Sequence, residues 1–282
     1  MRCQSEKLVI VFYGPDFGNV CLRDALTTWW NWTDGVCRTL DIAPTHIAGT
    51  FGDKPNRLKE YYTYSMKRSK SRFQEQLETD NVMWFALDVL DDRKAYIAFD
   101  WTLTSSCGLC KRGGRALFGL DCDAVSLWDA HTLASFMKQC LESANCIRIN
   151  YGFATIMPRD FLPAGYAVGI TTDAAGARLS YDTTAWCRYA ERECGHVLRN
   201  LYGWNILTPA HLAIDIGGTP LKNWINASPK RGKLYEIAPP LWCWSFEDIT
   251  EGKEYLKWEC EPVEAIRREL EGYQLFPWQT IH

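Results

Sequence analysis

The sequence lacks long hydrophobic runs and a strong excess of charge of either sign. The apolar run near its start, residues 8–13, ends at Gly14-Pro15-Asp16 and is too short to span a bilayer. The small-residue cleavage pattern of a signal peptide is also missing. The formal net charge of −3 argues against general nucleic-acid binding, which depends on Lys and Arg at phosphates. We therefore expect a cytoplasmic protein that binds neither membranes nor nucleic acid.

Motifs of common catalytic sites are also scarce. The chain has five histidines and no Gly-x-Ser-x-Gly elbow of a serine hydrolase. One C-x-x-C, from Cys107 to Cys110, supplies only two of the four ligands that a structural zinc site needs. Without a signal peptide, the 12 cysteines are expected to be reduced thiols. These absences favour a binding protein with no metal and no cofactor. A metal- or thiol-dependent enzyme using Cys107 and Cys110 is the alternative.

The sequence is rich in aromatic residues, with 13 Trp, 13 Tyr and 12 Phe among 282 residues. Such side chains bring large apolar area to a core, and they are also enriched where proteins meet proteins. Core packing is the commoner explanation, and a chain of this length has room for a large core.

Hydrophobic periodicity predicts strands and helices in alternation. The predicted strands cover residues 7–13, 82–89, 94–103, 115–120 and 146–154. The predicted helices cover residues 22–36, 55–77, 128–141, 184–201, 221–225 and a last stretch from Pro262 to just before Gly272. Residues 235–246 are apolar, but Pro239-Pro240 argues against a central strand there.

This order of elements predicts an α/β protein of the α+β kind, with a mixed, largely antiparallel sheet and helices packed on its faces. No break in composition requires a domain boundary, so we expect a single domain over residues 1–282. A division into two halves, residues 1–157 and 177–282, is the alternative.

A glycine pair gives a further motif, Ile214-Asp-Ile-Gly-Gly-Thr-Pro220. It resembles the phosphate loop of actin-like sugar kinases, but a lone short glycine motif is weak evidence. Only about 60 residues follow it, too few for the domains of such a kinase. We therefore expect a turn that uses the backbone freedom of Gly217 and Gly218 and leads into a helix.

The second half of the chain carries a distinctive order of segments. Its parts are residues 147–153 ending in Tyr151-Gly152-Phe153, a predicted helix with Arg188 and Arg199, the stretch from Tyr202-Gly-Trp to Gly217-Gly218, and then Leu221 and Trp224. Over roughly residues 145–275, this order resembles the bacterial family of type VI secretion immunity proteins.

The resemblance implies a cytoplasmic protein that is made beside a toxin gene and protects the producing cell. Such a protein binds its cognate effector toxin and neutralises it by occlusion, without catalysis of its own. A scaffold protein of a secretion system or prophage is a further alternative.

Acidic loops and neighbouring tryptophans are the predicted contacts with the toxin. Many toxins that degrade nucleic acid are basic, so carboxylates could imitate phosphate, and tryptophans commonly carry binding energy at interfaces. The nominated residues are Asp91, Asp92, Trp242, Trp244, Glu247, Asp248 and Glu251.

Overall fold

The computed structural model describes part of the chain, and for strands β2 to β6 it describes the backbone. The described residues are 6–16, 30–35, 37–38, 43, 46–51, 62–65, 71, 82–90, 96–103, 115–122, 129–143, 149–158, 186, 196–246, 256–257, 260–273 and 275–276.

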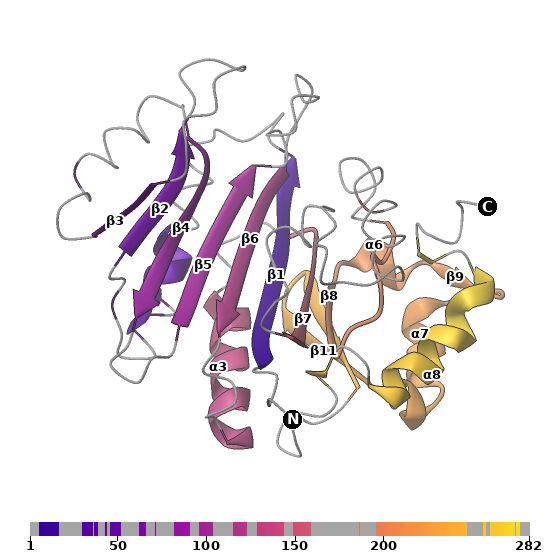
Figure 1. Ribbon diagram of the computed structural model, residues 1–282. Coiled ribbons are helices and arrows are strands. Elements are labelled where there is room, and N and C mark those ends of the chain that lie inside the picture. The colour runs from indigo at the N-terminus through magenta and orange to yellow at the C-terminus, as the bar shows by residue number, and fades with distance from the viewer. Residues whose placement is uncertain are drawn as a thin grey trace.

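A ten-stranded sheet runs through the molecule in the order β11-β12-β8-β7-β1-β6-β5-β4-β2-β3 (Figure 1). Its neighbouring strands are antiparallel throughout. The strands are β1 (Glu6–Asp16), β2 (His46–Phe51), β3 (Tyr62–Ser65), β4 (Val82–Leu90), β5 (Tyr96–Leu103), β6 (Arg115–Cys122), β7 (Tyr151–Pro158), β8 (Trp204–Leu207), β11 (Lys233–Ala238) and β12 (Leu241–Ser245). With helices packed beside it, this sheet confirms the predicted α+β class.

Strand β1 lies inside the sheet, between β6 and β7. Its side chains from Leu8 to Tyr13 are all buried, which explains why the sequence shows a continuous apolar run there and no alternation. Val9, Val11 and Tyr13 join the core cluster on one face. Phe12 contacts Trp32 instead, edge to face, with ring centroids 5.6 Å apart. The strand predicted for residues 7–13 is confirmed.

Helix α3 (Ala130–Ser143) and the helical residues 30–35 pack together on the Phe12 side of β1. The indole Nε1 of Trp32 donates a hydrogen bond to the carbonyl oxygen of Cys140, at 3.3 Å. Leu133, Phe136 and Met137 are buried along the apolar stripe of α3, as the prediction of a helix over residues 128–141 required.

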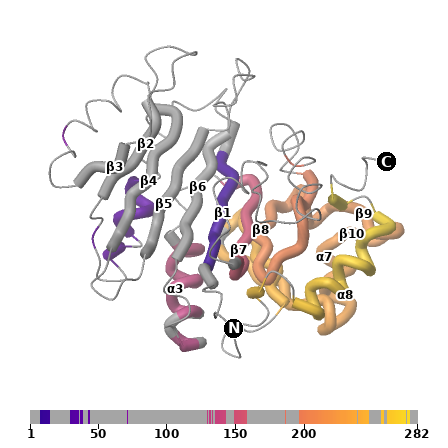
Figure 2. The backbone as a smooth tube through the Cα atoms, in the orientation of Figure 1, coloured from indigo at the N-terminus to yellow at the C-terminus, as the bar shows by residue number. Residues whose placement is uncertain are grey.

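The opposite face packs against the C-terminal helices α6 (Pro209–Leu212), α7 (Leu221–Asn226) and α8 (Glu261–Leu270). Short 3₁₀ turns η5 (Pro229–Arg231) and η8 (Glu271–Tyr273) follow α7 and α8. Aromatic rings fill this core, including Phe153 stacked on Tyr202 with centroids 4.0 Å apart. Figure 2 shows β1, β7 and β8 side by side, with α7 and α8 together beyond β8.

Two helix predictions are wrong in part. Within residues 55–77, the structure has strand β3, which pairs with β2. Its Tyr-Thr-Tyr-Ser sequence has the aromatic and β-branched residues that favour strands. The helix predicted over residues 184–201 does not extend to residue 201, because residues 196–200 form a turn and irregular backbone. Gly195, a residue type common just beyond helix ends, directly precedes them.

The prediction that Pro239-Pro240 excludes a central strand is also wrong. The two prolines occupy the turn between β11 and β12, and their peptide bond is cis. Both strands are therefore free of proline, and β12 lies between β11 and β8.

Candidate partner-binding site

The β11–β12 hairpin forms one end of the sheet and carries Trp242 and Trp244, the two nominated contact residues that the structure describes. In its register, Leu234 lies opposite Trp244 and Glu236 lies opposite Trp242. These four side chains share one face, because cross-strand partners in a sheet point the same way. Tyr235, opposite Cys243, points to the other face.

Trp244 is fully buried and holds the hairpin against the C-terminal helices. Its Nε1 donates a hydrogen bond to the carbonyl oxygen of Arg231, at 2.6 Å. The Arg231 guanidinium lies 3.8 Å from the centre of the Trp224 ring and forms an ion pair with Glu269. The ring of Trp244 does not reach solvent, so this residue holds the hairpin in place and does not itself contact a partner.

Trp242 is half-buried and contributes directly to the surface. The Lys222 ammonium of α7 lies 4.2 Å from the centre of its ring, within the range of a cation–π interaction. The pair presents an apolar ring and a positive charge side by side. Aromatic side chains of this kind are frequent in protein interfaces.

Tyr235 is exposed on the other face of the hairpin, with 39% of its surface accessible. Its ring meets Trp204 edge to face, with centroids 6.4 Å apart. Burial raises the pKa of the neighbouring Cys243 thiol to about 12, although a hydrogen bond with Tyr235 acts in the opposite direction. Cys243 is therefore a protonated, inert thiol near pH 7.

The charge of this region differs in sign from that of the whole chain. Residues 221–246 contain Lys222, Lys230, Arg231 and Lys233, but only one acidic residue, Glu236. Glu269 of α8 forms an ion pair with Arg231. Basic residues therefore outnumber acidic ones within residues 221–246, although Glu247 and Asp248 follow directly in the sequence.

The structure brings together only part of the nominated set. Trp242 and Trp244 occupy one face of β12 at different depths. The other nominated contacts, Asp91, Asp92, Glu247, Asp248 and Glu251, lie outside the described residues, as do Cys107 and Cys110. The sequence prediction missed Tyr235 and Lys222. The signal that could have identified Tyr235 is a short run with strand-forming residues, Lys-Leu-Tyr-Glu-Ile at residues 233–237, between Gly232 and the proline pair.

The Gly217-Gly218 motif forms the turn of a small hairpin, β9 (Asp215–Ile216) and β10 (Thr219–Pro220). Both glycines have positive φ, 60° and 87°. The Asp215 carboxylate accepts a hydrogen bond from the Gly218 amide, at 3.1 Å, so this amide is already engaged within the turn. Helix α7 begins at Leu221, and the predicted turn leading into a helix is confirmed.

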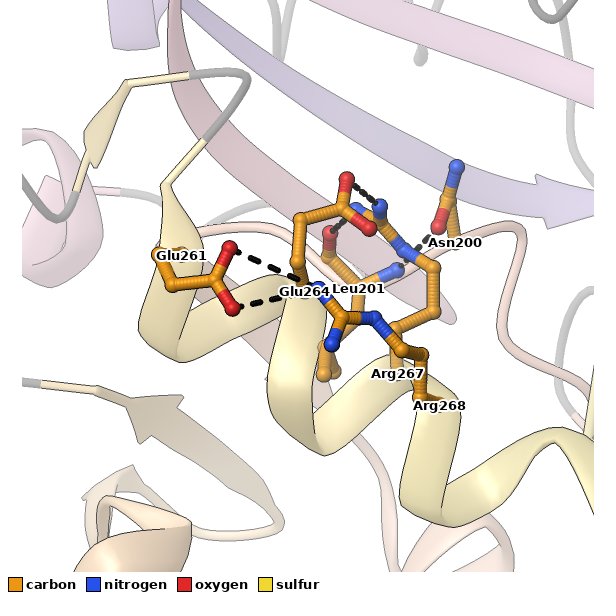
Figure 3. A network of polar contacts seen from close by, with 6 residues as sticks. All are labelled: Asn200, Leu201, Glu261, Glu264, Arg267 and Arg268. Atoms are coloured by element: carbon orange, nitrogen blue, oxygen red, sulfur yellow. Dashed lines mark hydrogen bonds and ion pairs between the residues drawn. The ribbon is translucent and has the colours of Figure 1, made fainter.

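A second polar arrangement connects α8 to the segment that precedes β8 (Figure 3). Arg267 is buried, forms an ion pair with Glu264, and donates from Nη2 to the carbonyl oxygen of Leu201, at 2.8 Å. The next residue, Arg268, pairs with Glu261 in solvent. These contacts fix α8 beside residues 200–201, and we assign them a structural role.

A buried polar cluster lies beneath α6. Nδ1 of His211 accepts a hydrogen bond from the backbone N–H of Thr208, at 3.2 Å, and the His211 ring stacks on Tyr151 with centroids 5.5 Å apart. Nearby, the Tyr13 hydroxyl accepts hydrogen bonds from Trp186 and Arg199. Burial lowers the pKa of His211 to about 4; a backbone hydrogen bond to Val197 opposes this shift, and His196 adds to it. Tyr13, Tyr151, Trp186, Arg199 and His211 are buried, whereas Thr208 is half-buried.

Within the described ranges, no group of three or more His, Cys, Asp or Glu side chains is placed to hold a metal ion. The described free cysteines, Cys37, Cys140, Cys243 and Cys260, are buried. Burial raises the pKa of Cys37 to about 12, with Asp34 adding to the effect. None of the described helices is long and apolar enough to cross a membrane.

Comparison with known proteins gives a structural likeness. No protein-family model matches the chain, and no curated protein matches its sequence significantly. Among solved structures, it is similar to the Pseudomonas aeruginosa T6SS protein PA0821, with a TM-score of 0.50 and 12% sequence identity. The alignment covers 96% of this chain and 73% of that chain. The two proteins therefore share a fold.

Proposed function

We propose that this chain is an immunity protein of a type VI secretion system that binds a cognate effector toxin and blocks it by occlusion. The observation that carries the proposal is the fold shared with a T6SS protein over 96% of the chain. The exposed aromatic and cationic side chains of the β11–β12 hairpin add support, because they form a rigidly held surface suited to a protein partner.

In this proposal, neutralisation depends on the shape and charge of a surface. A stable complex of this kind buries about 1,200–2,000 Å² in total. Protection of the producing cell requires tight binding, on the order of nanomolar. The Trp244–Arg231–Trp224 contacts serve this function indirectly, because they hold the hairpin in place and so reduce the entropy lost on binding.

The test is co-expression of the chain with the product of any toxin-like reading frame that lies next to its gene. We expect the two proteins to co-purify and the chain to restore growth of toxin-producing cells. Tyr235→Ala should weaken binding about tenfold or more. Arg38→Ala is the control, because Arg38 is an exposed residue outside the hairpin that pairs with Asp34.

A Cys107→Ser/Cys110→Ser variant separates binding from the enzymatic alternative. The proposal expects this double variant to bind the toxin and protect cells as the wild type does. Loss of protection together with loss of stoichiometric zinc would favour a metal-dependent enzyme instead. Protection without any contact with a toxin would contradict neutralisation by binding.

A further inference from the structure

The outer edge of β11 presents backbone groups that the sheet does not use. Among the described residues, β11 is the last strand at this end, and no strand pairs with its outer side. Such an edge is a template on which another extended segment can add a strand.

The direction of each backbone group follows from the ladder. The N–H of Phe246 donates to the carbonyl oxygen of Gly203, so Phe246 points its backbone groups towards β8. Backbone direction alternates along an antiparallel strand, so Trp244 and Trp242 also point to β8, and Ser245 and Cys243 point to β11. In the observed register, Ser245 and Cys243 pair with Lys233 and Tyr235.

Leu234 and Glu236 therefore direct their N–H and C=O groups to the outside of the sheet. This gives two donors and two acceptors at the spacing of an antiparallel ladder. The register shift between Glu236 and Ala238 ends the regular stretch, so the usable edge is short. The exposed charged residues Lys233 and Glu236 are typical of edges that resist indiscriminate pairing.

Two lysines lie near this edge. Lys230 is exposed in η5, directly before β11. Lys222 lies over Trp242, the cross-strand neighbour of Glu236. A segment carrying carboxylates would gain from both lysines, whereas a basic segment would be repelled.

We infer that the edge of β11 receives a short, extended, acidic segment of the toxin as an added antiparallel strand. The inference rests on the proposed function and specifies how the partner is held. Backbone hydrogen bonds to Leu234 and Glu236 supply the pairing, and Lys222 and Lys230 select the charge of the incoming segment.

The experiment uses proline to remove one outward N–H. Glu236→Pro deletes the outward donor at that position and leaves the β11–β12 ladder donors in place, since proline is tolerated where an edge N–H faces solvent. Glu236→Ala is the matched control, because it loses the carboxylate but keeps the amide. Binding to the toxin identified by co-expression is measured by calorimetry, with circular dichroism to check folding.

We expect Glu236→Pro to bind at least about tenfold more weakly than the wild type, and Glu236→Ala to stay within about threefold of it. A Lys222→Glu/Lys230→Glu variant should also bind more weakly than the wild type. The difference in affinity between the two should become smaller at high salt, because salt screens the charges. If Glu236→Pro does not fold, amide hydrogen exchange of the wild type with and without toxin replaces this test. An added strand must slow exchange at the amides of Leu234 and Glu236.

The outcomes separate the two proposals. Tight binding by the wild type with equal affinity for Glu236→Pro, or with unchanged exchange at both amides, overturns the added strand and leaves the immunity function standing. If the Lys222→Glu/Lys230→Glu variant binds the toxin more tightly than the wild type, the inference that the bound segment is acidic is overturned. Absence of toxin binding by the wild type contradicts the immunity function and the inference together.

Discussion

His211 shows how burial sets the protonation state of a single side chain. The ring is enclosed between Tyr151 and the start of α6, and Nδ1 accepts from the backbone N–H of Thr208. This environment fits a neutral imidazole, which explains the pKa lowered from its ordinary 6.5 to about 4. The fold therefore favours the unprotonated form.

From this shift we predict a loss of stability in mild acid. Below about pH 6.5, His211 becomes protonated in the unfolded chain. In the folded chain it stays neutral down to about pH 4. The stabilisation is thus complete above about pH 6.5 and falls, by up to about 1.4 kcal/mol per pH unit, as the pH drops towards 4. Urea unfolding at pH 7.5, 6 and 5 measures it.

His211→Gln is the comparison for this pH dependence. The variant should be less stable at pH 7.5, because a packed ring is lost, and its stability should fall less steeply with acid. Parallel curves for the two proteins would show that His211 does not carry the effect.

At the hairpin, sequence pattern identified the tryptophans but not their depth. Trp242 and Trp244 share a face of β12, and an alternating pattern predicts the same environment for both. Their difference comes from tertiary packing: Trp244 meets Arg231 and Trp224, whereas Trp242 is covered only in part and has Lys222 above it. The sequence does not state which side chains of α7 and η5 arrive there, so it could not separate the two roles.

Helix α8 places two arginines in adjacent positions with opposite surroundings. Arg267 is buried with Glu264, while Arg268 pairs with Glu261 in solvent, with side-chain accessibilities of 60% and 77%. A helix turns about 100° per residue, so neighbouring residues point in different directions.

We predict very different costs for removing the carboxylate of each pair. Glu264→Gln leaves the buried Arg267 without its counter-charge and should cost about 3–5 kcal/mol of unfolding free energy. Glu261→Gln, the matched control, should cost less than about 1 kcal/mol. Chemical denaturation measures both, and similar costs for the two variants would contradict a buried, structurally important ion pair.

Elements with strong local signals were predicted well. Strands β4 and β5 appear where two β-rich runs flank a polar stretch, and α3 and α8 appear where an apolar stripe repeats at helical period. The errors fall where local preference was ambiguous. Residues 62–65 fit both a helical stripe and a strand, and pairing with β2 decides between them. A proline pair can interrupt a strand or form a turn, and only the pairing of β11 with β12 settled that choice.

Across the whole molecule, one sheet joins strands from both halves of the chain. Strand β7, from the first half, pairs with β1 on one side and with β8, from the second half, on the other. The core beside them also mixes the halves, with Tyr13 and Tyr151 stacked at 5.6 Å and Leu212 and Trp224 in the same cluster.

We therefore predict that residues 177–282 do not fold alone. Without β7, strand β8 loses its inner partner and the aromatic core loses Tyr13, Tyr151 and Phe153. The isolated fragment should show no cooperative thermal transition, whereas co-expression with residues 1–176 should restore one. A fragment that unfolds cooperatively by itself would support the division into two independent halves.

The central place of β1 has a consequence for synthesis on the ribosome. Strand β1 pairs with β6 and β7, both of which are synthesised much later, so its apolar side chains remain unpaired in the sheet until both neighbours have left the ribosome. Long-range pairing of this kind slows folding. The β11–β12 hairpin is made later still, so a nascent chain acquires the strand at that edge of the sheet only after the middle of the sheet has been translated.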